Sequence, residues 1–191
     1  MAKVIIFGVQ DFAQLAKFYL QHDSEHEVVA FSVHKQYLPE GETFEGLPVV
    51  AFEDVEETYP ASEFKFFAPM SPSRMNKLRE SVYYQLRDKG FEMISYISSK
   101  ATVFPGTSIG DNCFILEDNT IQPFTSIGNN VVLWSGNHIG HHSRIGDHCS
   151  SRTSAKTTAY IAPHSHTACS RVNIPHSAYP LPQDSSRASI V

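Results

Sequence analysis

The sequence predicts an α/β N-terminal domain that is Rossmann-like, over residues 1–95, followed by a left-handed parallel β-helix of hexapeptide repeats over residues 96–149. Two observations predict this order. Short apolar segments alternate with amphipathic ones up to about residue 95, and from Ile97 onward an aliphatic residue recurs at every sixth position. Residues 150–191 show neither pattern, and we expect them to form an aperiodic tail that is disordered or poorly packed.

The N-terminal domain is predicted to be a small parallel sheet with helices on its faces. Its first strand, residues 4–7, is apolar throughout, as expected for a parallel strand buried on both sides, and Gly8 ends it. Further strands are expected at residues 28–33, 47–50, 64–67 and 93–97. Helices are predicted over residues 11–21, with Asp11 as the N-cap, and over about 73–89, with an apolar stripe formed by Met75, Leu78, Val82 and Leu86.

The β-helix is predicted from an unbroken spacing of six. A small or compact residue follows each aliphatic residue four positions later, and the second position is often glycine, as in Gly110 and Gly128. In hexapeptide repeats each unit forms one short strand and a turn, and three units complete one coil, so about three coils are expected. The aliphatic residues are Ile97, Val103, Ile109, Ile115, Ile121, Ile127, Leu133, Ile139 and Ile145.

The period of six ends abruptly after Cys149. The next positions in register are Ser151, Thr157 and Pro163, and the tail offers no recognisable cap for the last coil, whose strand edges need one. We interpret the abrupt end as a shifted or rearranged reading frame. This hypothesis is tested by translating the encoding DNA in its other two frames, one of which should restore aliphatic residues at every sixth position.

Composition excludes several classes of protein. A net charge of −5 and a sequence pI near 6.0 argue against a nucleic-acid partner, because such proteins concentrate Lys and Arg on one face. We expect no membrane span, since no segment is long and apolar enough to cross a bilayer. The three cysteines lack CxxC spacing, which favours a reduced, cytoplasmic location.

A Rossmann-like half joined to hexapeptide coils resembles the sugar O- and N-acyltransferases of the sialic-acid O-acetyltransferase and bacillosamine N-acetyltransferase type, over residues 1 to about 149. The resemblance implies an enzyme of cell-surface polysaccharide biosynthesis that transfers acetyl from acetyl-CoA to an amino or hydroxyl group of a nucleotide-linked sugar. It also implies that the N-terminal domain holds the nucleotide sugar and that the protein is a homotrimer. Acetyl-CoA is then expected between the coils of neighbouring subunits, and no metal is expected.

The resemblance also implies a catalytic base. In this family the base is a histidine in a segment such as His-Asp/Glu-Cys-x-Ile-Gly-Asp/Glu, and the matching segment here begins at His141, with His142 in the place of the usual acidic residue. An imidazole suits the removal of a proton from the acceptor. Asn137 and His138 are candidates for orienting the ring or binding substrate. For His138, His142 and His148 the alternative is an ordinary solvent-facing position.

Two further groups of residues are candidates for ligand contacts. Trp134 and Gly140 are predicted to contact acetyl-CoA, and Trp134 should point outward, as a trimer contact or as a stacking surface. In the N-terminal domain, Gln10 stands where a Gly-x-Gly-x-x-Ala loop has its second glycine, and His34 follows the second strand in place of an acidic residue. Arg74 could meet a phosphate. The predicted substrate-binding set is Gly8, Gln10, Asp11, His34, Ser71 and Arg74.

Two other classes of function remain open. One is a β-helix scaffold without catalytic activity, or the product of a truncated or frameshifted gene. The other is a relative of the γ-class carbonic anhydrases, in which His138, His142 and His148 would supply zinc ligands across a trimer interface. Release of thiol from acetyl-CoA separates the transferase from the scaffold, and metal analysis addresses the zinc protein.

Overall fold

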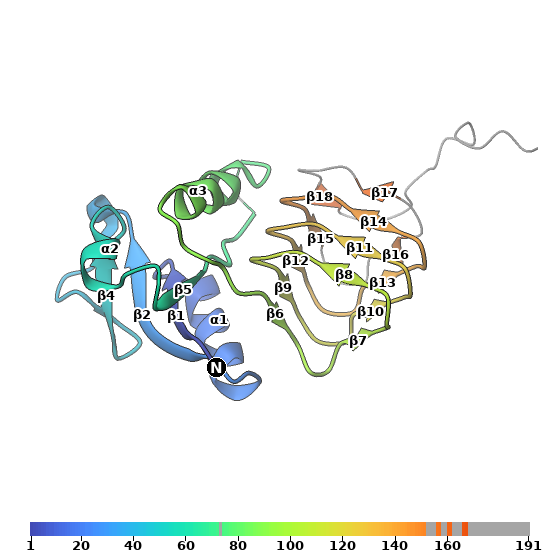
Figure 1. Ribbon diagram of the computed structural model, residues 1–191, viewed down its shortest axis with the longest axis horizontal. Helices are drawn as coiled ribbons and strands as arrows, with labels where there is room; N and C mark the ends of the chain where they lie inside the picture. The colour runs from blue at the N-terminus through green and yellow to red at the C-terminus, as the bar shows by residue number, and fades with distance from the viewer. Residues whose placement is uncertain (73, 152–155, 158–159, 162–165, 168–191) are drawn as a thin grey trace, which may run out of the picture.

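The computed structural model describes residues 1–72, 74–151, 156–157, 160–161 and 166–167. Figure 1 shows an α/β part, up to about residue 95, lying beside a β-helix built from stacked short strands. The two parts meet along one face of the β-helix. The order of the two architectures is therefore as the sequence predicts.

The α/β part is a five-stranded sheet with the strand order β3-β4-β2-β1-β5. Its four long strands are parallel, and β3 pairs antiparallel at the edge. The strands are β1 (Lys3–Phe7), β2 (Glu27–Val33), β3 (Thr43–Phe44), β4 (Leu47–Ala51) and β5 (Phe64–Phe67). The helices are α1 (Asp11–His22), the short 3-10 helix η1 (Lys35–Tyr37), α2 (Val55–Thr58) and α3 (Lys77–Asp88).

The apolar run in β1 is explained by the two faces of this sheet. Val4 and Ile6 pack in one core with Ala16 of α1, whereas Ile5 packs in a second core with Val82 of α3. Successive side chains of a strand point to opposite faces, so a strand covered by a helix on each face needs apolar residues at every position. Because both faces of β1 are buried, its sequence does not alternate between apolar and polar residues.

Both long helices differ in detail from the prediction. Asp11 is the first residue of α1, and the N-cap is Gln10, whose side chain makes no capping hydrogen bond. Helix α3 begins at Lys77 rather than near residue 73, because residues 74–76 have left-handed backbone angles, with φ between 47° and 65°, that no right-handed helix accepts. Residue 73, where the predicted helix begins, lies outside the described residues.

The predicted apolar stripe of α3 is half right. Val82 and Leu86 are buried, but Met75 and Leu78 are 65% and 45% exposed. Arg79 is buried instead, at 1% exposure, next to the predicted face. The expected strand at residues 93–97 is reduced to a bridge between Met93 and Phe66 and to the first strand of the β-helix.

The β-helix consists of three parallel sheets, and each coil contributes one strand to each sheet. Strands eighteen residues apart pair through the predicted aliphatic positions, as Ile97, Ile115 and Leu133 do along one sheet. The first sheet holds β6 (Tyr96–Ile97), β9 (Phe114–Ile115), β12 (Val132–Leu133), β15 (Ser150–Ser151) and β18 (His166–Thr167). The second holds β7 (Thr102–Val103), β10 (Thr120–Ile121), β13 (His138–Ile139) and β16 (Lys156–Thr157), and the third β8 (Ser108–Ile109), β11 (Ser126–Ile127), β14 (Arg144–Ile145) and β17 (Tyr160–Ile161).

The corners of the coils repeat a left-handed backbone conformation at every sixth residue. The side chains at these positions belong to the types that tolerate positive φ, with Phe124 the exception. Glycine is needed at residues 110 and 128 for another reason, which is space. A Cβ at Gly110 would lie 2.3 Å from the side-chain oxygen of Asn129 in the next coil, and one at Gly128 would lie 2.3 Å from that of Asp147. The left-handed positions are Gly106, Asn112, Asp118, Phe124, Asn130, Gly136, His142 and His148.

The strand ladders continue beyond the boundary predicted at Cys149. Ser150 and Ser151 form β15, and both are buried. β16 pairs with the strand eighteen residues earlier, whereas β17 pairs with the strand sixteen residues earlier, so Ile161 rather than Pro163 stands opposite Ile145. The rest of the predicted tail lies outside the described residues. The hypothesis of a shifted reading frame concerns the DNA and stays a prediction.

The sheet that begins with β6 faces the α/β part. Phe114 and Val132 on this sheet join the same core as Ile6, and the Tyr19 hydroxyl of α1 donates a hydrogen bond to Glu117 Oε2 at 2.9 Å. Trp134 is half-buried and packs edge-to-face on Phe12 of α1, with ring centroids 5.4 Å apart. This differs from the outward position predicted for Trp134, because the α/β part of the same chain covers that face.

Arg79 joins α3 to the last fully described coil. Its guanidinium donates to the carbonyl oxygens of His148 and Cys149, at 3.1 and 3.0 Å, and to Ser150 Oγ at 3.0 Å. Asn76 adds a hydrogen bond from its Nδ2 to the carbonyl of His148. Burial lowers the pKa of Arg79 from 12.5 to about 10, which leaves the guanidinium charged at neutral pH. These bonds hold the start of α3 rigidly against the β-helix.

Replacing Arg79 should therefore destabilise the protein strongly. Arg79→Ala leaves buried carbonyl oxygens and the Ser150 hydroxyl without their donors, and we expect it to lower the free energy of unfolding by about 3 kcal/mol or more. Chemical denaturation measures the change. Leu78→Ala, an exposed site on the same helix, is the control and should cost much less. Equal losses in the two variants would contradict the role of Arg79.

Asp23 makes the contact between the parts dependent on pH. Hydrogen bonds from Ser99 and from the Tyr96 hydroxyl, at 2.8 and 2.7 Å, lower the pKa of this carboxyl from 3.8 to about 2. A lowered pKa stabilises the folded state above about pH 4, and this contribution is lost as the pH falls towards 2. Thermal unfolding between pH 5 and 2 should thus show a steeper loss of stability in the wild type than in Asp23→Asn. Parallel curves would contradict this.

Candidate functional site

His141 and His142 lie together at the corner between β13 and β14, and both are exposed. Their Nδ1 atoms are 3.1 Å apart, and the rings meet edge-to-face. The backbone N–H of His141 donates to Gln122 Oε1 at 3.1 Å, and that of His142 donates to the carbonyl of Pro123 at 3.2 Å. The ring of His142 also packs on Phe124, with centroids 4.9 Å apart. The predicted base is therefore accessible and held from the coil below.

This corner points away from the α/β part. The coils have three sides, and the sheet of β6, β9, β12, β15 and β18 contacts the α/β part. The corner of His141 joins the other two sheets, so it lies opposite the contact face, as the arrangement in Figure 1 shows. Within a single chain, the β-helix itself separates His141 from the sheet of the N-terminal part.

The other predicted residues of this region divide into exposed and buried ones. His138 is exposed on β13, and Gly140 is buried, with its carbonyl accepting from Thr125 Oγ1 at 3.1 Å. Asn137 is 1% exposed and points into the coil, where its Nδ2 donates to Asn119 Oδ1 at 2.9 Å and its Oδ1 accepts from the Ser151 hydroxyl. The contacts described for Asn137 therefore lie inside the coil, and none of them is with His141.

His148 differs most from the expectation of a solvent-facing residue. It is 2% exposed, between the coil and α3. Its Nδ1 accepts a hydrogen bond from Asn130 Nδ2 at 2.8 Å, so the hydrogen sits on Nε2, which lies 3.3 Å from the Tyr84 hydroxyl. His148 thus stands at a different corner from His142, and the three histidines of the zinc reading do not converge within the chain.

In the N-terminal part, four of the predicted substrate residues lie at the carboxyl ends of β1 and β2. Gly8 has φ 119°, which an L side chain rarely adopts, and its N–H donates to the carbonyl of Ser32. Gln10 and Asp11 follow at the exposed start of α1. The His34 ring packs on Phe7, and its Nδ1 lies 3.0 Å from Glu53 Oε1. Sequence reasoning missed Glu53, although an acidic residue just after a parallel strand was the available signal.

Ser71 and Arg74 are exposed in the segment that leads from β5 to α3. Both ends of this segment are bound to the coils: Asn112 Oδ1 accepts from the N–H of Ala68 at 2.8 Å, and Asn76 bonds to the His148 carbonyl. The segment therefore runs along the β-helix. No described contact brings Ser71 or Arg74 to Gly8 or His34.

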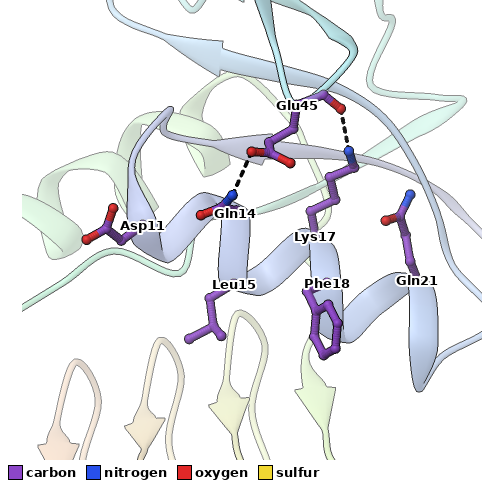
Figure 2. A pocket seen from close by; sticks show the side chains of 7 residues that line it. All are labelled: Asp11, Gln14, Leu15, Lys17, Phe18, Gln21 and Glu45. Atoms are coloured by element: carbon purple, nitrogen blue, oxygen red, sulfur yellow. Dashed lines mark hydrogen bonds between the residues drawn. The ribbon is translucent and has the colours of Figure 1, made fainter.

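An open pocket of about 360 Å³ lies beside α1 (Figure 2). Gln14 Nε2 donates to Glu45 Oε1 at 2.7 Å, and Lys17 bonds to the Glu45 carbonyl. Glu45 sits in the tight turn between β3 and β4, which the sequence reading did not include. Asp11 is the only predicted site residue that lines this pocket. The other lining residues are Gln14, Leu15, Lys17, Phe18, Gln21 and Glu45.

Over the described part of the chain, no three His, Cys, Asp or Glu side chains are grouped so that they could hold a metal ion. Among the helices found there, none has the length and apolar character needed to cross a bilayer.

Comparison with known proteins identifies the repeat and the fold. The family described as "Bacterial transferase hexapeptide (six repeats)" matches residues 106–141, which confirms the predicted hexapeptide repeat there. No curated protein matches the sequence. Solved structures do resemble it: the acetyltransferase domain of PglB from Neisseria gonorrhoeae FA1090 has a TM-score of 0.63 at 13% identity, with 85% of this chain and 74% of that chain covered.

Two other structures give the same picture. WeeI from Acinetobacter baumannii AYE has a TM-score of 0.64 at 18% identity, over 82% of this chain and 72% of that chain. PerB from Caulobacter crescentus, solved in complex with CoA and GDP-perosamine, has a TM-score of 0.53 at 16% identity, over 87% and 83% of the two chains. At these identities the likeness shows a shared fold, which includes the α/β part as well as the coils.

Proposed function

We propose that this protein transfers acetyl from acetyl-CoA to an amino or hydroxyl group of a nucleotide-linked sugar, with His141 as the general base. The observation that carries the proposal is the exposed imidazole of His141 at a coil corner, with one ring nitrogen held by His142. The fold likeness adds support, because the PglB structure is of an acetyltransferase domain and PerB was solved with CoA and a nucleotide sugar.

The chemistry needs one proton acceptor. The acceptor nitrogen or oxygen attacks the thioester carbonyl, a C–N or C–O bond forms, and the C–S bond to CoA breaks. His141 takes the proton that the nucleophile loses, and that proton ends on the departing thiolate or in solvent. Nδ1 of His141 faces His142, so Nε2 is the atom free to receive it.

We further propose that the α/β part is a Rossmann-like nucleotide-sugar domain and that the β-helix is left-handed. Ligands of open parallel sheets bind at the carboxyl ends of the strands, next to the point where the strand order reverses. In the order β4-β2-β1-β5 that point is between β1 and β5, beside Gly8 and Gln10. The candidates for contact with the nucleotide are Gly8, Gln10, Asp11 and His34, with Ser71 and Arg74 nearer the β-helix.

The distance between these two places calls for a second copy of the chain. His141 lies on the far side of the β-helix from the sheet of its own chain, so a sugar held at β1 reaches a base only from a neighbouring subunit. A trimer satisfies this geometry, since each β-helix then presents its corner to the next N-terminal part. Acetyl-CoA would lie between the coils of two subunits, beside Gly140.

Replacing His141 tests the assignment of the base. His141→Asn should lower thiol release from acetyl-CoA, measured with a panel of nucleotide amino-sugars, by about 100-fold or more, because the proton acceptor is lost. His22→Asn, an exposed histidine on α1 that belongs to none of the candidate sites, is the control and should change the rate little. Wild-type protein that releases no thiol with any acceptor would favour the catalytically inactive scaffold instead.

Mixing two inactive variants tests the shared site. Gln10→Trp blocks the predicted nucleotide edge, and His141→Asn removes the base; alone, each should be inactive. Co-expressed with different tags and isolated as mixed trimers, the two should regain about a third of the wild-type sites, because one of the three contacts in each mixed trimer joins intact halves from neighbouring subunits. Mixed oligomers that stay inactive would show that both halves belong to one chain.

A further inference from the structure

We propose that His142 is a positioning residue that accepts a hydrogen bond from Nδ1–H of His141 and so fixes the tautomer in which Nε2 takes the substrate's proton. This inference rests on the proposed function. It assigns a role to the position where the acyltransferases that the sequence resembles usually carry an acidic residue. The carboxylate that would orient the base is absent here, and a second imidazole stands in its place.

The distance between the two rings requires one shared hydrogen. Nδ1 of His141 and Nδ1 of His142 are 3.1 Å apart, which is a hydrogen-bond distance for two ring nitrogens. A neutral imidazole has one nitrogen that donates and one that accepts, whereas a protonated ring only donates. The pair is therefore bonded when one ring supplies the hydrogen and the other stays neutral, and it is broken when both carry protons on Nδ1.

The direction of the bond follows from the reaction. If His141 donates from Nδ1, its Nε2 has a free lone pair and can take the substrate's proton; the imidazolium that results still donates from Nδ1. His142 then keeps the same hydrogen on Nε2 throughout. In the opposite direction Nε2 of His141 already carries a hydrogen, so the outward nitrogen could not act as a base without both rings exchanging protons.

The backbone holds His142 where this bond needs it. His142 occupies a left-handed corner position with φ 57°, and its ring packs on Phe124, which occupies the same corner one coil earlier with φ 63°. The corner before that is Gly106, where an added Cβ would lie 3.5 Å from the Phe124 ring. His141 is held independently, because its N–H donates to Gln122 Oε1. The preceding coil thus places the ring of His142 and the backbone of His141.

An imidazole partner has a consequence that a carboxylate lacks. A carboxylate goes on accepting hydrogen bonds well below neutral pH, whereas an imidazole can take a proton within the range in which enzymes work. Activity then requires two unprotonated rings instead of one. On the two strands that flank this corner, the other titratable or charged residues are His138 on β13 and Arg144 on β14, and both are exposed. In the strand ladders, Lys156 on β16 stands opposite His138, and Tyr160 on β17 stands opposite Arg144.

The slope of the acid limb in the pH profile tests this requirement. With one acceptor used throughout, the acid limb of log kcat/KM in the wild type should become steeper by one than that of His142→Asn at the low end of the pH range, where the second ring also takes up a proton. In His142→Asn the amide oxygen accepts the same bond without titrating, so the acid limb should keep the lower slope throughout, with activity largely kept; His142→Asp should give the same lower slope. His142→Ala should lower kcat by about 10- to 100-fold, as when a partner that orients a histidine is removed. Acid limbs of the same slope in the wild type and in His142→Asn would overturn the proposal.

A measurement without substrate separates this proposal from the proposed function. Nitrogen-15 NMR of the histidine rings in the full-length protein should place the hydrogen on Nδ1 in His141 and on Nε2 in His142, with His138→Asn as the assignment control. In His142→Ala, His141 should lose its single tautomer. A hydrogen on Nε2 of His141 in the wild type would overturn the inference. If the protein shows the expected tautomers but never releases thiol, the transferase function is wrong and the inference about His141 and His142 stands.

Discussion

The six-residue turn of the coil is the constraint on which the rest of the structure depends. Each unit must place an aliphatic side chain inside and then bend the chain at a left-handed corner, and the corners recur at Gly106, Phe124 and His142 along one edge. Because the coil interior is filled by Ile121, Ile127, Ile139 and Ile145, which are 0 to 3% exposed, the corner residues can only point outward or against a neighbouring element. An exposed histidine pair follows from this packing.

A ladder of polar side chains sets how the two parts of the chain are joined. The N–H of Ala68 donates to Asn112, Asn112 to Asn130, and Asn130 to His148, at 2.8 Å each. The first donor is a backbone group whose direction cannot reverse, so it orders every amide after it and leaves His148 with an acceptor at Nδ1. With Arg79 beside it, this edge of the coil is occupied by the chain's own α3. The edge that carries His141 and His142 is exposed instead.

The sequence predicts what depends on local spacing and misses what depends on contacts between distant residues. The period of six identifies the strands up to Ile145, because each unit repeats the same demand on six consecutive residues. Nothing local marks Arg79 as buried or Trp134 as covered by Phe12, since both environments are made by the other part of the chain. The exposed position of His141 is predictable from the repeat; the placement of His148 against α3 is not.

The corner position after His141 can carry different side chains without a change in the backbone of the repeat. A left-handed corner accepts Asp, Asn and His more readily than most residues, so an acidic residue and a histidine can occupy the same backbone position after the base. In the proposed arrangement, both accept a hydrogen bond from Nδ1 of the preceding ring. They differ in charge: a carboxylate stabilises the imidazolium that forms during transfer, whereas a neutral imidazole only orients it. In the proposed mechanism, a histidine at residue 142 therefore keeps the orientation of the base and gives up electrostatic stabilisation, and the acceptor itself can take a proton.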